Sequence, residues 1–279
     1  PWMAGVSALF TREFFTSVRS RLVDGGVFCQ WGHLYNMSEA DLATLLATFG
    51  DVFPKASVYV ISEADILIVG RDGSSALSSA RLEGMSAAAR LDLAASNLTA
   101  DSLVSIPTVA LDKLADWLRD ARRHTDDAPV LDFSAPLSIH AQTASANRRR
   151  LIPEDAPGTL AALKARLTLL GASGSSEWAY EVAERAISGG LSDRTIGLEY
   201  VKGAVRLRRV EAAEATLFAA IARAPSAPLH VTQALLYWNT GRADRALQSL
   251  EAASRLDPLD PSAYLLGAEI QSGAGNLQA

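Results

Sequence analysis

The chain contains one cysteine, Cys29, and only four histidines in 279 residues. A single thiol cannot form an internal disulfide, and the histidines lack the spacing of a metal site. Long hydrophobic runs are also missing, since no segment reaches the roughly 18 consecutive apolar residues of a membrane-spanning helix. The sequence therefore predicts no internal disulfide, no metal site and no membrane segment within these residues.

Neither half of the chain carries a strong excess of basic or acidic residues. Positions 1–150 hold 14 basic and 17 acidic residues, and positions 151–279 hold 12 and 14, for a net charge of -5. Nucleic-acid-binding domains concentrate lysine and arginine on one face, so we expect no nucleic-acid partner. The hydrophobic share of 49% and the charged share of 20% are typical of a folded chain.

Both ends of the chain interrupt a pattern. It opens with Pro1-Trp2-Met3-Ala4-Gly5 and no initiator methionine, and residues 275–279 resemble a turn followed by the start of a helix. We therefore expect an internal fragment of a longer protein. The absence of a signal peptide or membrane anchor here then carries no information about that longer protein.

Positions 1–140 mix helical and strand patterns. Apolar spacing predicts helices over 5–22, 38–50, 76–95 and 111–122, and strands over 27–31, 57–62 and 65–70. Asp24-Gly25-Gly26 is expected to end the first helix, and Ser38 is expected to cap the second. The last two strands are close in sequence, which predicts an antiparallel pair. This element order is typical of the back half of a doubly wound sheet with an antiparallel edge.

Positions 158–279 are helical throughout and contain a repeat. Ala246, Leu250, Ala253 and Pro258 recur one repeat earlier as Ala213, Leu217, Ala220 and Pro225. Small residues at these positions let two antiparallel helices approach closely, and the proline ends the second helix. The period resembles that of tetratricopeptide repeats, which is about 34 residues. An alanine-rich helical bundle with accidental spacing is the alternative.

A linker is expected over 141–157, between a first domain at 1–140 and the repeats at 158–279. Arg148-Arg149-Arg150 and the two prolines Pro153 and Pro157 mark this boundary. The basic triplet is interpreted as part of a solvated linker.

The first domain resembles the spermidine synthase family. The similarity lies in Pro1-Trp2-Met3-Ala4-Gly5, in Leu9-Phe10 with Phe14-Phe15, in Gly25-Gly26-Val27-Phe28-Cys29-Gln30, and in Thr125-Asp126-Asp127-x-Pro129-x-Leu131-x-Phe133. The resemblance implies a C-terminal half of a class I methyltransferase-like Rossmann domain. It also implies transfer of an aminopropyl group from decarboxylated S-adenosylmethionine to a diamine such as putrescine.

The same resemblance limits what these residues can do alone. In the family, the glycine-rich nucleotide loop and the catalytic acid lie upstream of the motifs matched here, so we expect the fragment itself to be inactive. Spermidine synthase-like proteins of this kind often carry a membrane-embedded N-terminal region and tetratricopeptide repeats. The resemblance thus places the parent in the cytoplasm or at the cytoplasmic face of a membrane.

Three residues are candidates for binding substrate. Gln30 stands at the end of a strand, where ligands of open α/β sheets bind, and it is interpreted either as substrate-facing or as a structural amide. His33 is either an acid–base group or an incidental loop histidine. Trp2 either lines the substrate pocket or packs against a helix.

Other polar residues have simpler interpretations. Asp126 and Asp127 either bind an amine or stabilise a turn. Cys29 is expected to be a small core residue rather than a nucleophile. The alternative to an aminopropyltransferase-like enzyme is a non-catalytic scaffold, whose repeats bind a peptide or protein partner in the groove that stacked helix pairs form.

Overall fold

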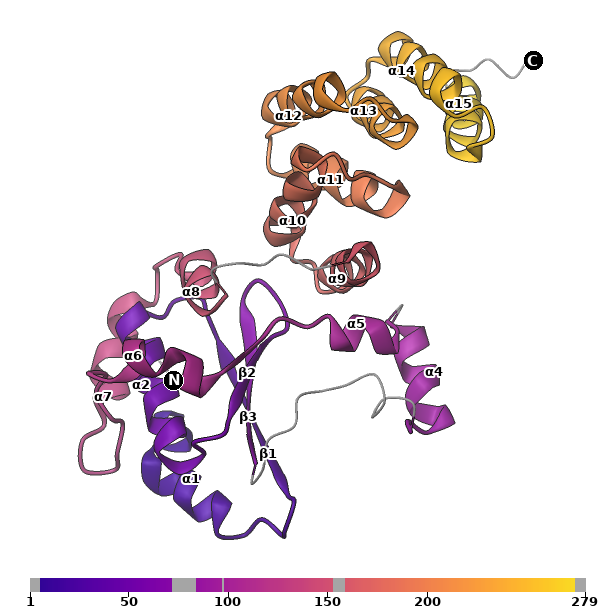
Figure 1. Cartoon of the computed structure of the whole chain (residues 1–279). Coiled ribbons are helices and arrows are strands. Elements are labelled where there is room, and N and C mark those ends of the chain that lie inside the picture. The colour runs from indigo at the N-terminus through magenta and orange to yellow at the C-terminus, as the bar shows by residue number, and fades with distance from the viewer. Residues whose placement is uncertain (1–5, 72–83, 97, 153–158, 274–279) are drawn as a thin grey trace. The chain divides into compact units, whose positions relative to one another are not determined.

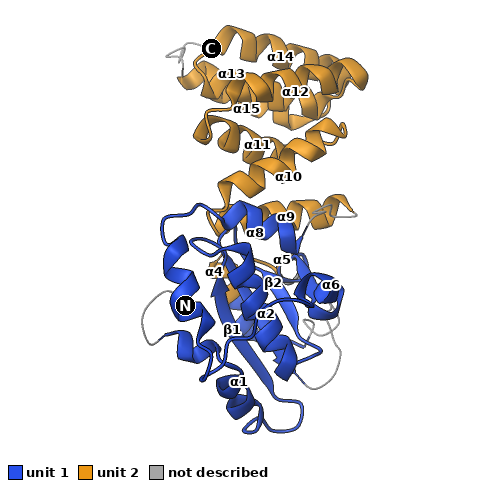
Figure 2. Cartoon of the chain, turned by 90° about the vertical axis from the view of Figure 1, so that its left-hand side faces the viewer, with its two compact units in different colours: residues 1–91, 103–155 blue, residues 92–102, 156–279 orange. Residues whose placement is uncertain are grey.

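A computed structural model of the chain describes residues 6–71, 84–96, 98–152 and 159–273 (Figure 1). The chain forms two compact units, coloured separately in Figure 2. The first comprises residues 1–91 and 103–155, and the second comprises residues 92–102 and 156–279. An α/β unit thus precedes an all-helical region, as the sequence predicts.

The first unit is built on a four-stranded sheet. Its strands are β1 (Val27–His33), β2 (Ser57–Val60), β3 (Asp65–Arg71) and β4 (Thr108–Ala110), in the spatial order β1-β3-β2-β4. Every neighbouring pair is antiparallel, which confirms the antiparallel pairing predicted for the second and third strands. Because β3 lies antiparallel to both β1 and β2, those two strands run in the same direction.

The described residues up to position 152 also form short helices. They are η1 (Ser7–Phe10), α1 (Arg12–Arg19), α2 (Glu39–Val52), α4 (Ala87–Ala95), α5 (Ala100–Val104), η2 (Leu111–Leu114), α6 (Ala115–Leu118), α7 (Val130–Ser134), η3 (Ala135–Ser138) and α8 (Ala144–Leu151). The helix predicted over 76–95 lies outside the described residues up to position 83, and α4 occupies its C-terminal part.

The sequence predicts one continuous helix over 5–22, and this prediction was wrong, because η1 and α1 are separate helices. Thr11 adopts an extended conformation (φ -76°, ψ 153°), and its side chain accepts a hydrogen bond from the Phe14 N–H at 3.2 Å. Such a cap starts a new helix at the next residue. The helix α1 also ends at Arg19, before the glycine pair that was expected to stop it.

Helix α2 begins as predicted. The Ser38 hydroxyl oxygen accepts a hydrogen bond from the Asp41 N–H at 3.1 Å and donates one to the Asp41 carboxylate at 2.7 Å. The helix continues beyond Gly50 to Val52 and packs on one face of the sheet through aromatic rings. Phe28 of β1 stacks 5.9 Å from Phe49 of α2, so α2 and this face of β1 share a core.

The opposite face of β1 is more open. Side chains alternate along a strand, so Val27, Cys29 and Trp31 point away from Phe28. Val27 is 54% exposed and Trp31 is 47% exposed. Cys29 is exposed too, so its expected place in the core was wrong. Partial burial still raises the pKa of the Cys29 thiol, which agrees with its interpretation as a non-nucleophile.

The segment expected as a linker contains a packed helix, α8. The Asn147 side-chain amide donates to the carbonyl oxygens of Leu34 and Met37, both at 2.8 Å. Arg148 is 1% exposed, so it does not belong to a solvated linker, whereas Arg150 pairs with Glu39 at 3.0 Å. These contacts attach α8 to the loop that follows β1 and to the start of α2.

Residues 159–273 of the second unit form seven helices of similar length, while α4 and α5 are divided between the two units. They are α9 (Leu160–Ala172), α10 (Ser176–Ser188), α11 (Arg194–Arg206), α12 (Val210–Arg223), α13 (Ala227–Asn239), α14 (Ala243–Leu256) and α15 (Pro261–Gly273). Alternate helices begin at positions 160, 194, 227 and 261, so each helix pair takes up about 34 residues, the period expected from the sequence. The intervening helices begin at positions 176, 210 and 243 and keep the same spacing.

The turns between these helices repeat as closely as the helices do. Gly174, Arg208 and Gly241 each stand two residues before a helix and have positive φ values of 70°, 56° and 75°. The next residue in each case donates a backbone hydrogen bond across the turn to a carbonyl five positions earlier, at 2.8 to 2.9 Å. This is the six-to-one bond of a Schellman motif.

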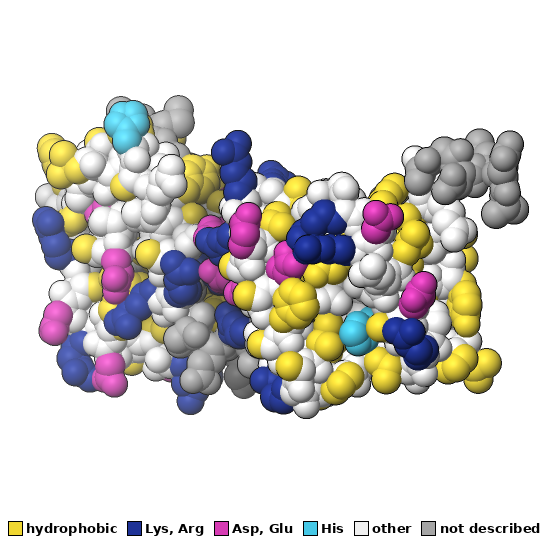
Figure 3. All heavy atoms as spheres, turned by 90° about the horizontal axis from the view of Figure 1, so that it is seen from above, with side chains coloured by type: hydrophobic (Ala, Val, Ile, Leu, Met, Phe, Trp, Pro, Cys, Tyr) yellow, Lys and Arg dark blue, Asp and Glu magenta, His cyan; other side chains and the backbone are white. Residues whose placement is uncertain are grey.

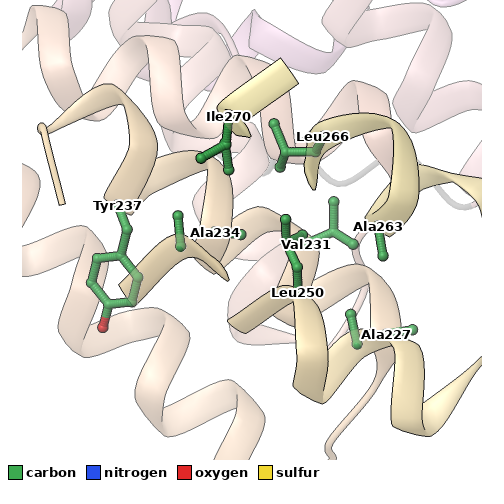
Figure 4. Packing of buried hydrophobic residues seen from close by; sticks show 10 residues of the cluster. Ala227, Val231, Ala234, Tyr237, Leu250, Ala263, Leu266 and Ile270 are labelled. Atoms are coloured by element: carbon green, nitrogen blue, oxygen red, sulfur yellow. The ribbon is translucent and has the colours of Figure 1, made fainter. Parts of the chain in front are cut away.

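The core of the last helices follows the alanine and leucine pattern seen in the sequence. Ala246, Leu250 and Ala253 of α14 are buried against Ala227, Val231 and Ala234 of α13 (Figure 4). Small side chains on both helices allow the close approach that the sequence pattern predicts.

Candidate functional site

Of the residues proposed from the sequence, His33 ends β1, whereas Gln30 lies in the middle of the strand, because β1 continues two residues beyond the predicted end at Trp31. Gln30 is paired with Ile68 of β3, and its side-chain amide donates to the Trp31 carbonyl oxygen at 3.1 Å. Trp31 and His33 have side chains on the opposite face of the strand from Gln30, because successive residues alternate. The structure therefore separates the two candidates Gln30 and His33.

His33 groups with two other aromatic residues instead. Its ring centroid lies 5.6 Å from that of Trp31 and 4.9 Å from that of Tyr35. The His33 side chain is 1% exposed, and this burial lowers its pKa to about 3. The imidazole is therefore neutral at physiological pH, which disfavours its interpretation as a proton-transfer group tuned to neutral pH.

Sequence reasoning missed the carboxylate of this cluster. The Trp31 indole N–H donates to the Asp65 carboxylate at 3.2 Å, and the Ser62 hydroxyl donates to its other oxygen at 2.9 Å. Asp65 begins β3, far along the chain from Trp31, so only the antiparallel register brings the two together. No local motif in the sequence reports a contact of this kind.

The cluster of Trp31, His33, Tyr35 and Asp65, called the aromatic–carboxylate cluster below, has the chemistry of an amine site. An ammonium group is attracted to an indole face, and the attraction is worth about 0.5–1 kcal/mol at an exposed site. A carboxylate retains acceptor capacity beyond the two bonds that Asp65 receives. The neutral His33 ring adds no repulsive positive charge at pH 7.

The remaining candidates do not join this cluster. Trp2 lies outside the described residues. Asp126 donates its backbone N–H to the Glu13 carboxylate at 3.0 Å, and the Thr125 hydroxyl accepts from Ala128 at 3.0 Å to form the turn. The turn is thus stabilised by Thr125 rather than by the Asp126 or Asp127 side chains.

A buried histidine that the sequence did not single out holds this turn in place. His124 is fully buried, and its two ring nitrogens contact the Ser7 carbonyl oxygen at 2.9 Å and the Leu131 N–H at 3.3 Å. One nitrogen donates and the other accepts, as in the neutral tautomer. His124 therefore has a structural role that joins η1 to α7.

Gly25 and Gly26 do not form a nucleotide-binding glycine loop. A nucleotide-binding glycine loop follows a strand and opens a helix. Gly25 and Gly26 instead form the turn before β1, with a φ of 73° at Gly25 and a bond of 2.8 Å from the Gly26 N–H to the Val23 carbonyl. These glycines offer no cradle for decarboxylated S-adenosylmethionine.

The helical unit contains a groove of about 350 Å³ where α9, α10 and α11 meet. Glu199, Lys202 and Arg206 of α11 line it, with Lys202 3.1 Å from Glu199 and Arg206 donating to the Ser176 hydroxyl at 2.9 Å. Two glycines, Gly171 and Gly203, also line the groove. It can accept a chain segment that carries charged groups.

Comparison with known protein families, with characterised proteins and with solved structures gave no match for this chain. Among the described residues, no helix is long and apolar enough to cross a membrane. Within the same residues, no group of three or more His, Cys, Asp or Glu side chains is placed to hold a metal ion.

Proposed function

We propose that the first unit is the amine-binding, C-terminal part of a spermidine synthase-like Rossmann domain. The observation that carries the proposal is the aromatic–carboxylate cluster at the end of β1. The arrangement of β1, α2 and β2 supports it, since two strands of like direction joined through a helix are the unit of a doubly wound sheet. The parent's reaction would transfer an aminopropyl group to a diamine such as putrescine.

Putrescine binding by the chain tests the amine site directly. Titration monitored by tryptophan fluorescence should show saturable binding, because Trp31 lies in the cluster. Asp65→Asn should weaken binding about 5- to 30-fold, as expected for loss of a charged hydrogen-bond partner. Asp116→Asn, an exposed surface change, should leave binding unchanged. Equal affinities for wild type and Asp65→Asn would refute the amine site.

The full-length protein tests the enzymatic part of the proposal. Calorimetric titration with decarboxylated S-adenosylmethionine, followed by putrescine, should show binding that tightens when the amine is added. A protein that binds neither compound and forms no spermidine is not an aminopropyltransferase.

A scaffold with tetratricopeptide-like repeats is the second candidate function. The regular recurrence of helix starts and the charged groove of α9, α10 and α11 support it. Fluorescence anisotropy with short acidic and basic peptides tests this function. Arg206→Glu should shift the preference away from acidic peptides, and a chain that binds no peptide in either form would count against it.

A further inference from the structure

The groove between α9, α10 and α11 lacks two side chains that the next repeat carries at the equivalent positions. Helices α9 and α10 begin at positions 160 and 176, and α11 and α12 begin at 194 and 210, so equivalent residues lie 34 positions apart. Gly171 and Gly174, which line the groove, therefore correspond to Val205 and Arg208. An added Cβ at Gly174 would meet nothing within 4 Å, so the space beside it is open.

The polar lining of the groove is equally specific to this repeat. Helix α13 begins at position 227, 33 residues after the start of α11, so the equivalent of each α11 residue lies 33 positions later. The four polar side chains of the lining are replaced by uncharged ones in the next repeat: Ser176, Glu199, Lys202 and Arg206 correspond to Val210, Thr232, Leu235 and Asn239. Helix pairs of this chain therefore pack without these polar groups, which points to binding rather than packing as their role.

The charges of the lining favour an anionic group. Glu199 is 17% exposed and pairs with Lys202 at 3.1 Å, so these two charges offset each other. Arg206 donates to the Ser176 hydroxyl at 2.9 Å and forms no ion pair with any residue that the structure describes. A guanidinium has five N–H donors and binds a carboxylate through two parallel hydrogen bonds. The groove therefore has one positive charge that can receive one carboxylate.

The surface of α11 beside the groove is apolar on both sides of Lys202. Leu198 and Val205 are 38% and 42% exposed, and they stand four residues before and three residues after Lys202, on the same helix face. Figure 3 shows basic, acidic and hydrophobic side chains interspersed over one face of the molecule, so the described residues drawn there form no broad region of one charge. Local contacts of this kind therefore select the partner.

We propose that this groove receives an internal glutamate or aspartate side chain of a peptide partner, flanked in the peptide by apolar residues. The inference rests on the second candidate function, the repeat scaffold. Arg206 binds the carboxylate, and the space beside Gly171 and Gly174 admits its stem. Because apolar side chains lie both before and after Lys202 on α11, the peptide continues on both sides of its acidic residue.

Fluorescence anisotropy of the chain with two short, dye-labelled peptides tests the proposal. Both peptides are acetylated and amidated at their ends, and they differ only in a central Leu-Glu-Leu or Leu-Gln-Leu. The wild-type chain should bind the glutamate peptide about 10-fold more tightly, as expected for a hydrogen bond to a charged group. Arg206→Gln should remove this preference. Arg194→Gln is the matched control, because it removes the same charge from an exposed position of α11 outside the groove, and it should keep the preference.

A second variant fills the groove without changing its charge. Gly171→Val introduces the residue that α11 carries at the equivalent position, and an added Cβ there lies 3.4 Å from the Glu199 carboxylate, so the variant is expected to fold. Binding of the glutamate peptide should weaken about 10-fold or more. Gly267→Val makes the same change in α15, where an added Cβ lies 3.7 Å from Leu250, and it should leave binding unchanged. Circular dichroism of both variants verifies that the helices are retained.

The outcomes separate this proposal from the scaffold function on which it rests. A wild-type chain that binds neither peptide overturns both. Equal affinity for the two peptides, or a preference that persists in Arg206→Gln, overturns the acidic side chain as the ligand and leaves the scaffold function standing. A glutamine peptide with a free C-terminal carboxylate is the last probe. If it binds as tightly as the blocked glutamate peptide, the groove takes a chain end, and the proposal of an internal acidic residue is overturned.

Discussion

Arg208 occupies a backbone position that glycine fills in the neighbouring repeats. Its φ of 56° lies in the left-handed region, where a side chain costs about 1–2 kcal/mol. Gly174 and Gly241 hold the equivalent turns with open space around the position of an added Cβ. Arg208→Gly should therefore stabilise the helical unit by about 1 kcal/mol, as measured by urea denaturation monitored by circular dichroism. Gly241→Arg should destabilise it by a similar amount, and equal stability of wild type and Arg208→Gly would contradict this view.

His33 makes the stability of the first unit depend on pH. Its pKa of about 3 in the folded chain lies below the value of about 6.5 in the unfolded chain. Between these values only the unfolded state binds the proton, so stability present above pH 6.5 falls as the pH is lowered toward 3. The expected loss is about 2–3 kcal/mol between pH 7 and pH 4.5.

Denaturation of wild type and His33→Phe at both pH values isolates this contribution, with the Trp31 fluorescence as a local signal. The difference in unfolding free energy between the two proteins should shrink or reverse on acidification. His140→Gln controls for removal of a histidine from the surface. An unchanged difference at the two pH values would show that His33 is not the titrating group.

At the scale of elements, replacing each of two helix glycines by alanine is expected to change the stability of the helical unit in opposite directions. An added Cβ at Gly203 of α11 would lie 2.6 Å from the Tyr180 Cβ of α10, closer than these helices can accommodate without moving. Gly203→Ala should therefore cost about 1–3 kcal/mol despite its gain in helix propensity. Gly267→Ala in α15 meets only Leu250 at 3.7 Å and should gain about 0.5–1 kcal/mol. Chemical denaturation measures both, and the same sign for the two variants would contradict the packing argument.

The elements that could be predicted are those with strong periodicity. The helices of 159–273 follow from regularly spaced alanine and leucine, and α2 follows from the Ser38 cap. Strand β4 is only three residues long and is a strand because it pairs with β2. The local sequence does not predict this pairing. Helix α8 was missed because its polar sequence is fixed by hydrogen bonds of the buried Asn147 amide rather than by an apolar stripe.

The aromatic–carboxylate cluster illustrates the same limit at the candidate site. The sequence singled out the end of β1, and His33 does lie there, but it could not show that Gln30 faces the other way. Asp65 joins Trp31 only through the register between β1 and β3. Strand register is set by turn geometry and by burial of one face, which emerge only with the whole sheet.

At the scale of the molecule, the two units should differ in their behaviour when separated. Residues 158–279 contain a continuous helical core and should remain soluble and helical when expressed alone. Residues 1–140 should aggregate, because β1 forms one edge of the described sheet and exposes Val27 and Trp31. Size-exclusion chromatography and circular dichroism of the two pieces test this, and a monomeric, folded 1–140 would contradict it.

Extending the first piece to residue 152 should improve its behaviour. That piece regains α8, whose Asn147 amide caps the Leu34 and Met37 carbonyls. Leaving such buried carbonyls without a donor costs about 1–3 kcal/mol each. Thermal unfolding should therefore occur at a higher temperature for 1–152 than for 1–140, and equal midpoints would show that α8 adds nothing.

The sheet order also determines when the first unit can form during synthesis. Strands β1 and β2 both bond to β3 and not to each other, and β3 is the last of the three to be synthesised. Until residue 71 has left the ribosome, β1 has no complete ladder partner among the strands described here. The backbone groups of β1 therefore lack their β3 hydrogen-bond partners while α2, β2 and β3 are translated. A pause in translation within β3 would prolong the interval in which a chaperone can bind the nascent chain.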